Sequence, residues 1–150
     1  MIVLDTDVLA LHHFFATDPR HASTSAFMER TRTTGRGTTL YNLLEFAGIL
    51  SSAGKPDVAR KMIQVYATAT DMTLLYPLLP ASSPELFFAD YTAELMDTME
   101  RGLRYGDAKI LWVAEANDAS ALVTWNTRHY QGKTPVEIVT PEDYLKSVEP

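Results

Sequence analysis

The sequence contains no cysteine, no long hydrophobic run and no excess of positive charge. Without cysteine there is neither a disulfide framework nor a zinc–thiolate site. No apolar stretch approaches the roughly 18 residues that are needed to span a membrane. The start of the chain has no basic segment followed by an apolar one, as a signal peptide would. We therefore expect a cytoplasmic protein that makes no membrane contact.

The formal net charge of −6 limits the ways in which the chain can meet nucleic acid. Proteins that bind DNA through broad electrostatic attraction are usually basic, so this charge disfavours a sequence-reading DNA binder. It does not exclude a nuclease, because bound divalent cations cancel part of an acidic site's charge and local basic residues still meet phosphates. The length of 150 residues predicts a single domain, 1–150, with a core of its own.

Short apolar segments alternate with longer amphipathic ones along the chain. This pattern predicts strands over 1–4, 38–41, 72–77, 121–125 and 136–140, and helices over 7–16, 19–32, 42–53, 56–70, 84–103, 107–117 and 141–148. Strands that are separated by helices form parallel sheets. In such a sheet the carboxyl ends of the strands and the amino ends of the helices meet at one edge, where ligands bind.

Three acids and one amide fall at this predicted edge. Asp5 ends the first strand, where a buried charge is costly unless it is paired or bound to a metal. Glu45 lies in the first turn of the helix after the second strand, Asp107 begins a later helix, and Asn126 follows the fourth strand. All four supply oxygen atoms, which are the preferred ligands of hard cations. The sequence therefore predicts a Mg²⁺ or Mn²⁺ site.

Most of these residues also have a structural interpretation. Asn42 and Glu45 have the spacing of a helix capping box. Asp107 suits the N-cap of its helix, and Asn126 suits a turn. Asp7 is expected to be the N-cap of the first helix. A capping carboxylate can also bind a ligand, so these alternatives do not exclude the metal site.

Basic residues accompany the predicted site. Arg104 and Arg128 flank Asp107 and Asn126, and we expect both arginines, with the neighbouring Thr127, to contact the substrate and its phosphates. The basic segment 29–37 is expected to be a solvated loop.

The same segments resemble the motifs of PIN-domain nucleases. "IVLDTDVLA" resembles the D-T-N-V-L opening of that family, and "LYNLLEFAGIL" resembles its second motif with a single Glu. "GDAKILWVAEANDASALVTWNTRHY" resembles its third and fourth motifs. The ordered set spans the chain and is most similar to the VapC-like toxins of type II toxin–antitoxin pairs. The resemblance implies a three-layer α/β/α fold with a central, mainly parallel sheet of four to five short strands.

The resemblance also implies an activity, namely Mg²⁺- or Mn²⁺-dependent hydrolysis of RNA. The catalytic positions of the family carry over to Asp5, Glu45, Asp107 and Asn126, and the first three of these would hold the metal. Many members have Asp where this chain has Asn126, which leaves open whether one metal or two are used. Asp7 stands where the family often has Asn, so it either adds a carboxylate or only caps the helix. The implied partners are a second copy of the chain and a small antitoxin protein.

Two other functions fit parts of the sequence. In a haloacid-dehalogenase-like phosphatase, Asp5 would be the nucleophile and Asp7 the general acid. That family holds its metal with a later pair of acids, and the second of these positions is Leu111 here. The other alternative is a non-catalytic PIN scaffold that only binds a protein partner.

Overall fold

The structure is a computed structural model in which residues 1–80 and 82–148 are described. In chain order the elements are β1 (Ile2–Leu4), α1 (Thr6–Phe14), α2 (His21–Arg30), β2 (Arg36–Thr39), α3 (Leu40–Ser52), α4 (Pro56–Thr68), β3 (Thr73–Leu75), α5 (Pro84–Glu100), α6 (Tyr105–Ala116), β4 (Ala121–Val123), the 3₁₀ helix η1 (Thr127–His129), β5 (Glu137–Val139) and α7 (Pro141–Ser147).

The described strands form one five-stranded sheet in the order β3-β2-β1-β4-β5. Every pair of neighbouring strands in it is parallel. The central strand β1 is joined to both of its neighbours, since Ile2 lies opposite Arg36 of β2 and Ala121 of β4. The prediction of a parallel sheet of short strands is confirmed. α-Helices lie in the crossovers between β1 and β4, whereas the connection from β4 to β5 contains only the 3₁₀ helix η1.

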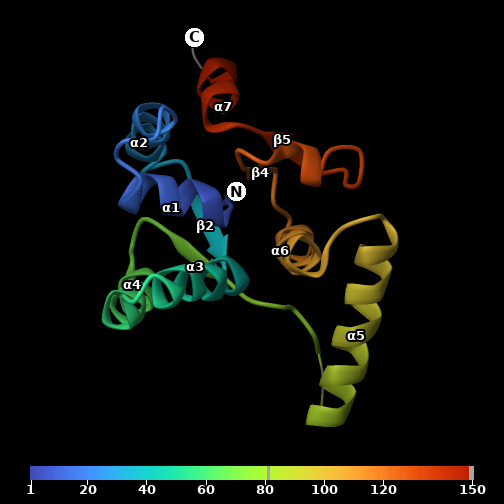
Figure 1. Cartoon of the computed structure of the whole chain (residues 1–150). Coiled ribbons are helices and arrows are strands. Elements are labelled where there is room, and N and C mark those ends of the chain that lie inside the picture. Colours follow the sequence, from blue (N-terminus) through green and yellow to red (C-terminus); the bar gives the residue numbers. More distant parts are fainter. Residues whose placement is uncertain (81, 149–150) are drawn as a thin grey trace.

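Helices cover both faces of the sheet, as Figure 1 shows. Side chains alternate along β1, so Val3 packs into the core on the side of α5 and α6. Ile2 and Leu4 pack into the core on the opposite side, together with apolar residues of α1, α2 and α7. The predicted three-layer α/β/α arrangement is therefore confirmed.

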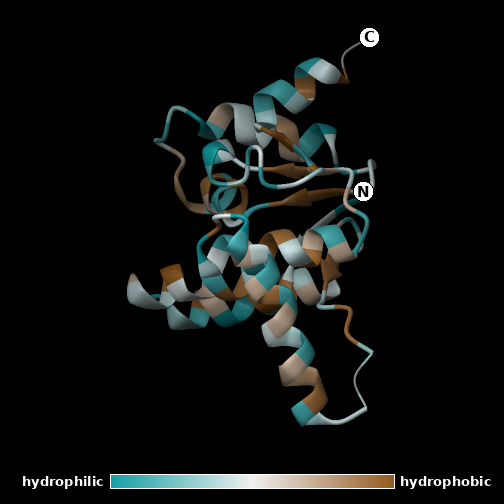
Figure 2. Cartoon of the chain, turned by 90° about the vertical axis from the view of Figure 1, so that its right-hand side faces the viewer, coloured by the Kyte–Doolittle hydropathy of each residue, from teal (hydrophilic) through white to brown (hydrophobic). Residues whose placement is uncertain are grey.

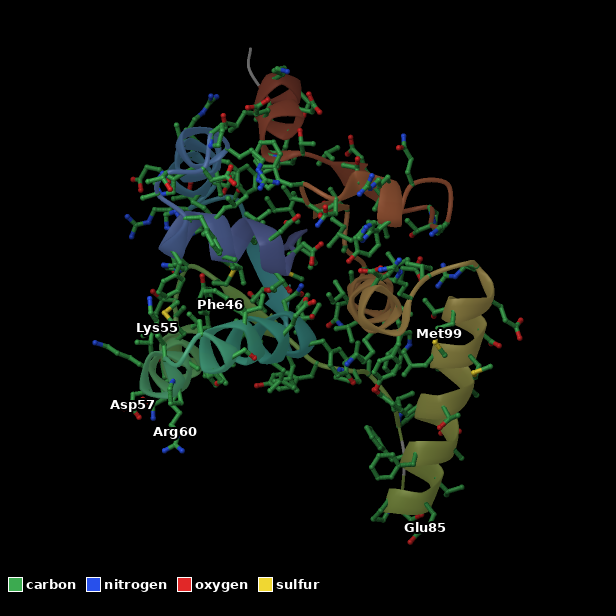
Figure 3. The ribbon with its side chains drawn as sticks, viewed as in Figure 1. Phe46, Lys55, Asp57, Arg60, Glu85 and Met99 are labelled. Carbon is green, nitrogen blue, oxygen red and sulfur yellow. The ribbon has the colours of Figure 1, made fainter. Side chains whose placement is uncertain are left out.

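The long helix α5 extends beyond the rest of the molecule (Figures 1 and 2). Its buried residues, Leu95 and Thr98, lie in its last two turns, where Met99 also packs against the core. Glu85 lies at the opposite, free end of the helix (Figure 3), and Phe88 close to it is 63% exposed. No helix in residues 1–80 and 82–148 is long and apolar enough to cross a membrane.

The start of α3 differs from the prediction. The strand β2 ends at Thr39 and the helix begins at Leu40, whereas the sequence predicts a strand over 38–41. Thr39 is the N-cap, and it exchanges capping hydrogen bonds with Asn42. The expected capping box of Asn42 and Glu45 is therefore wrong. Glu45 lies in the second turn of α3, where no capping role accounts for its carboxylate.

Two further local predictions are wrong. The second helix was predicted to begin at residue 19, but α2 begins at His21 with Arg20 as its N-cap, and Asp18 accepts hydrogen bonds from the backbone and guanidinium of Arg20. Arg36 does not lie in a solvated loop. It belongs to β2, is 5% exposed and donates to Asp71 and to the carbonyl oxygen of Met28.

Candidate active site

Side chains from distant parts of the chain line a cavity of about 240 Å³ at the carboxyl edge of the sheet. Its lining residues are Asp5, Thr6, Asp7, Glu45, Ile49, Asp107, Asn126 and His129. They come from the amino end of α1, from α3, from α6 and from the segment after β4. The structure thus brings together all four residues that the sequence predicts to be catalytic.

Asp5 is buried, with 6% of its surface exposed, and both of its carboxylate oxygens accept hydrogen bonds. Its Oδ1 accepts from the backbone N–H of Thr6 at 2.7 Å and from Asn42 Nδ2 at 3.0 Å. Its Oδ2 accepts from Thr124 Oγ1 at 2.8 Å and from the Tyr130 hydroxyl at 3.3 Å. These donors, together with the N-cap position on α1, explain how a carboxylate is tolerated at a buried strand tip.

The cavity holds more negative charge than its protein partners neutralise. Burial raises the pKa of Asp5 to about 6, since the nearby charges of Glu45 and Asp107 add to its effect and outweigh the hydrogen bonds that favour the carboxylate. Burial also raises the pKa of Asp7 to about 7, and the charge of Asp5 contributes. A cation bound here would favour the ionised form of each carboxyl group and displace its proton.

Asp7 lies in the first turn of α1, but it is not the N-cap, because Asp5 occupies that position. Its Oδ2 accepts from the backbone N–H of Trp125 at 2.9 Å, from Asn126 Nδ2 at 3.1 Å and from Thr124 Oγ1 at 3.2 Å. Its Oδ1 is buried and makes no hydrogen bond within the described residues, although the backbone N–H of Val8 also favours the ionised form of Asp7. The prediction that Asp7 caps the helix is therefore wrong, and its second oxygen lacks a well-formed hydrogen bond.

Glu45 is connected to Asp5 through a chain of hydrogen bonds. The Thr6 hydroxyl donates to Glu45 Oε2, and Asn42 Nδ2 donates both to Thr6 Oγ1, at 3.1 Å, and to Asp5. Asn42 is itself fully buried. This network holds the start of α3 against the start of α1, so the more exposed Glu45 faces the same cavity as Asp5.

Asp107 is the third residue of α6, whose N-cap is Arg104, so the expectation that Asp107 is an N-cap is wrong. Its Oδ1 lies 3.5 Å from the Tyr130 hydroxyl, and its Oδ2 lies 3.5 Å from His129 Nδ1. Burial and the charges of Asp5 and Asp107 raise the pKa of the Tyr130 phenol, which therefore remains a hydrogen-bond donor between the two carboxylates. The amino end of α6 favours the negative charge of Asp107.

Asn126 is the exposed residue that precedes η1. Its backbone N–H donates to Thr124 Oγ1 at 3.0 Å, and its side-chain amide donates to Asp7. Asn126 thus lines the cavity, but its side chain bonds Asp7 and makes no capping hydrogen bond to η1, so the prediction that it stabilises the turn is wrong. Its catalytic role stays a prediction.

A basic cavity of about 320 Å³ lies next to the acidic one. Its lining residues are Gly102, Arg104, Asp107, Arg128, His129 and Lys133. Asp107 and His129 line both cavities, so the predicted substrate contacts Arg104 and Arg128 lie beside the predicted metal ligands. Thr127 begins η1 between Asn126 and Arg128, but it is not among the described residues that line either cavity.

Several residues of the site were not singled out from the sequence. His129 and Thr124 follow β4 at the predicted edge of the sheet, so their position in "TWNTRHY" was an available signal. Asn42 was singled out only for a capping box, and Tyr130 was not singled out at all. Each is almost completely buried, and each takes part in the site through a hydrogen bond to Asp5 that only the folded chain provides.

The donor set fits a hard cation in its chemistry. Asp5, Glu45 and Asp107 contribute only oxygen atoms to the cavity, and Asp7 Oδ1 is a buried oxygen without a well-formed hydrogen bond. Within residues 1–80 and 82–148, no three acidic, histidine or cysteine side chains are already placed to hold a metal ion together. Binding therefore requires the carboxylates to converge from their present positions.

Comparisons with known proteins show which fold this is. No protein-family model and no curated protein matches the chain. A toxin–antitoxin complex from Klebsiella pneumoniae is similar in structure, with a TM-score of 0.60 and 17% identity over 94% of this chain and 98% of that chain. FitAcB from Neisseria gonorrhoeae has a TM-score of 0.61 and 15% identity over 94% and 98% of the two chains.

A third similar structure is VapC20 of Mycobacterium tuberculosis, a toxin that cleaves the sarcin-ricin loop. Its TM-score is 0.56, and the identity is 17% over 81% of this chain and 87% of that chain. At such low identities the likeness establishes the fold alone. The predicted resemblance to the fold of VapC-like PIN domains is confirmed.

Proposed function

We propose that the protein is a Mg²⁺- or Mn²⁺-dependent ribonuclease and the toxin of a type II toxin–antitoxin pair. The observation that carries this proposal is the convergence of Asp5, Glu45 and Asp107 on one cavity from three separate elements. The fold that the chain shares with a toxin–antitoxin complex and with a toxin that cleaves the sarcin-ricin loop supports it. The expected reaction is hydrolysis of an RNA phosphodiester bond.

Asp5, Glu45 and Asp107 would hold the cation in the cavity. A bound Mg²⁺ or Mn²⁺ lowers the pKa of a water ligand and polarises the scissile phosphate. Glu45 is the most exposed of the three carboxylates, and it is held by a hydrogen bond from Thr6, so it is suited to accept the proton of the attacking water.

The basic cavity provides the substrate contacts. Arg104 and Arg128 bind the phosphates of the RNA next to the scissile bond, and Thr127 remains a further predicted contact. Because Asp107 and His129 line both cavities, the phosphodiester chain passes directly from the arginines to the acids. Local positive charge thus compensates for the net charge of −6.

The proposed partners are a small antitoxin, which blocks the acidic cavity, and a second copy of the chain. Large apolar side chains that are exposed in the structure support contacts of this kind. Phe15, after the end of α1, is 48% exposed, and Leu86 and Phe88 on α5 are 52% and 63% exposed. We further propose a cytoplasmic location, where an RNA substrate and an antitoxin are both accessible.

The phosphatase alternative lacks support at the position of its late acid. That position is Leu111 on α6, which is fully buried in the apolar core. The non-catalytic alternative predicts no cleavage of any RNA, and the experiment below separates it from the proposal.

The proposal is tested by RNA cleavage with purified protein in the presence of Mg²⁺ or Mn²⁺. Asp5→Asn and Asp107→Asn should each lower the rate by about 100-fold or more, since even residues that only support a metal ligand contribute up to about that factor. Asp57→Asn, on the outer side of α4 (Figure 3), is the matched control and should keep the full rate. Full activity in both site variants would show that the cavity is not the active site.

A further inference from the structure

We propose that Asp7 is the fourth acidic residue of the cavity and contacts the bound cation. Asn126 does not contact the cation itself; it is the positioning residue for Asp7. This inference rests on the proposed function, because the cation is the one that Asp5, Glu45 and Asp107 would hold.

The two carboxylate oxygens of Asp7 have very different surroundings. Oδ2 accepts from the backbone N–H of Trp125 and from Asn126 Nδ2, and it shares the single hydroxyl proton of Thr124 with Asp5. Oδ1 is buried and makes no hydrogen bond within the described residues, although Asp7 lines the same cavity as the predicted metal ligands. A buried carboxylate oxygen without a well-formed hydrogen bond is unfavourable, and a cation is the partner that compensates it.

A purely structural role for Asp7 leaves its charge unexplained. All of these donors meet one oxygen, so an asparagine at this position would accept the same hydrogen bonds through its single carbonyl oxygen. That asparagine would also carry no charge beside the buried Asp5. The features that only an aspartate provides at position 7 are the negative charge and the second oxygen, and a cation uses both.

Asn126 acts on the cavity through Asp7. A carboxylate only accepts hydrogen bonds, so the side-chain amide of Asn126 presents its Nδ2 to Asp7 Oδ2, at 3.1 Å. The backbone N–H of Asn126 is fixed in turn by Thr124 Oγ1, at 3.0 Å, and this hydroxyl also reaches Asp5 Oδ2, at 2.8 Å. Asn126 therefore holds Asp7 Oδ2 in place and leaves Oδ1 for the cation.

The test is calorimetric titration of the full chain with Mn²⁺ in the absence of RNA. Asp7→Asn is nearly isosteric and keeps the hydrogen bonds that Oδ2 accepts, so it changes mainly the charge and the oxygen that lacks a well-formed hydrogen bond. We expect it to weaken Mn²⁺ binding by at least about tenfold. Its melting temperature without metal should be equal to or above that of the unchanged protein, because an uncompensated buried charge is removed.

The double variant Asp7→Asn with Asn126→Asp tests rescue. It again has one carboxylate and one amide at positions 7 and 126, but in exchanged places, and it should restore most of the lost Mn²⁺ affinity. Asn126→Ala keeps the charge of Asp7 but releases its orientation, and it should weaken Mn²⁺ binding less than Asp7→Asn does. It also tests the inference independently if Asp7→Asn fails to fold. The control Asp57→Asn should bind Mn²⁺ as the unchanged protein does.

Asp5→Asn distinguishes failure of the inference from failure of the proposed function. If Asp5→Asn loses Mn²⁺ binding while Asp7→Asn retains the full affinity, Asp7 is not a ligand and only the inference is overturned. If both variants bind Mn²⁺ unchanged, the proposed metal site itself is wrong. If the exchange restores nothing, or if Asn126→Ala binds unchanged, the assignment of Asn126 as the positioning residue is overturned.

Discussion

The side-chain amide of Asn42 donates a hydrogen bond of 3.0 Å to Asp5 Oδ1, although the two residues are 37 positions apart. The same nitrogen donates to Thr6 Oγ1, and the amide oxygen accepts from the backbone N–H and hydroxyl of Thr39. A single buried side chain thus joins the start of α3 to the N-cap of α1, and it holds a carboxylate of the candidate active site in place.

Replacing Asn42 with alanine is expected to lower the free energy of unfolding by about 2–4 kcal/mol, because buried groups of Asp5 and Thr39 lose their partners. Denaturant unfolding measures the change. Gln64→Ala, on the exposed face of α4, is the control, and its effect should stay within about 0.5 kcal/mol. An equally small effect of Asn42→Ala would contradict the structural role given to this network.

The basic cavity predicts the salt dependence of RNA binding. Replacing Arg104 or Arg128 with glutamine should weaken binding and should reduce the slope of log K against log salt by about 0.7 for each phosphate that the protein no longer binds. Binding is measured with Asp107→Asn as the background, so that no cleavage interferes. Arg60→Gln, on the outer side of α4 (Figure 3), changes the net charge equally and should leave the slope unchanged. The same slope in all variants would remove the arginines from the interface.

His13 predicts a loss of stability in mild acid. Burial lowers the pKa of its imidazole from 6.5 to about 4, and the charge of the neighbouring His12 adds to this effect. The unfolded chain therefore binds a proton near pH 6.5, whereas the folded chain, with His13 Nε2 2.9 Å from the Tyr66 hydroxyl, does so only near pH 4. The stability that the unprotonated His13 contributes to the folded chain is fully present above pH 6.5 and is lost as the pH falls towards 4.

Urea unfolding at pH 7.5 and at pH 5 measures this effect. The unchanged protein should lose more stability between the two pH values than His13→Gln, which has no titrating group at this position. The difference should be modest, because His13 is partly exposed and solvent screens its charge. An identical loss in both proteins would show that His13 titrates normally.

The parts of the fold that local chemistry decides were predictable from the sequence. Ser83 and Thr140, each followed by proline, predict the starts of α5 and α7, and both helices begin at that proline. The apolar runs predict β1 and β4, because strands that are buried on both faces are mostly apolar. The buried strand β2, with the sequence RGTT, has no such run and was predicted only in part. The parallel order of the sheet then brings Asp5, Glu45 and Asp107 to one edge, as expected.

The parts that depend on distant partners were not predictable. The start of α3 is one case. The N-x-x-E spacing of Asn42 and Glu45 fits a capping box, but in the structure Asn42 pairs with Thr39 and its Nδ2 donates to Asp5, which the local sequence does not reveal. Similarly, Arg36 is buried because Asp71, 35 positions later, accepts its hydrogen bond. The orientation of Asp7 depends on Asn126, 119 positions away.

The central claim is that Asp5, Glu45 and Asp107 bind the cation that RNA cleavage requires. The most direct measurement is anomalous X-ray diffraction from crystals soaked in Mn²⁺, at a concentration that supports cleavage in solution. The account predicts an anomalous peak within the cavity, at bonding distance from oxygens of these carboxylates, and its loss in Asp107→Asn crystals. A fully occupied Mn²⁺ site elsewhere on the protein, with no peak in this cavity, would contradict the account.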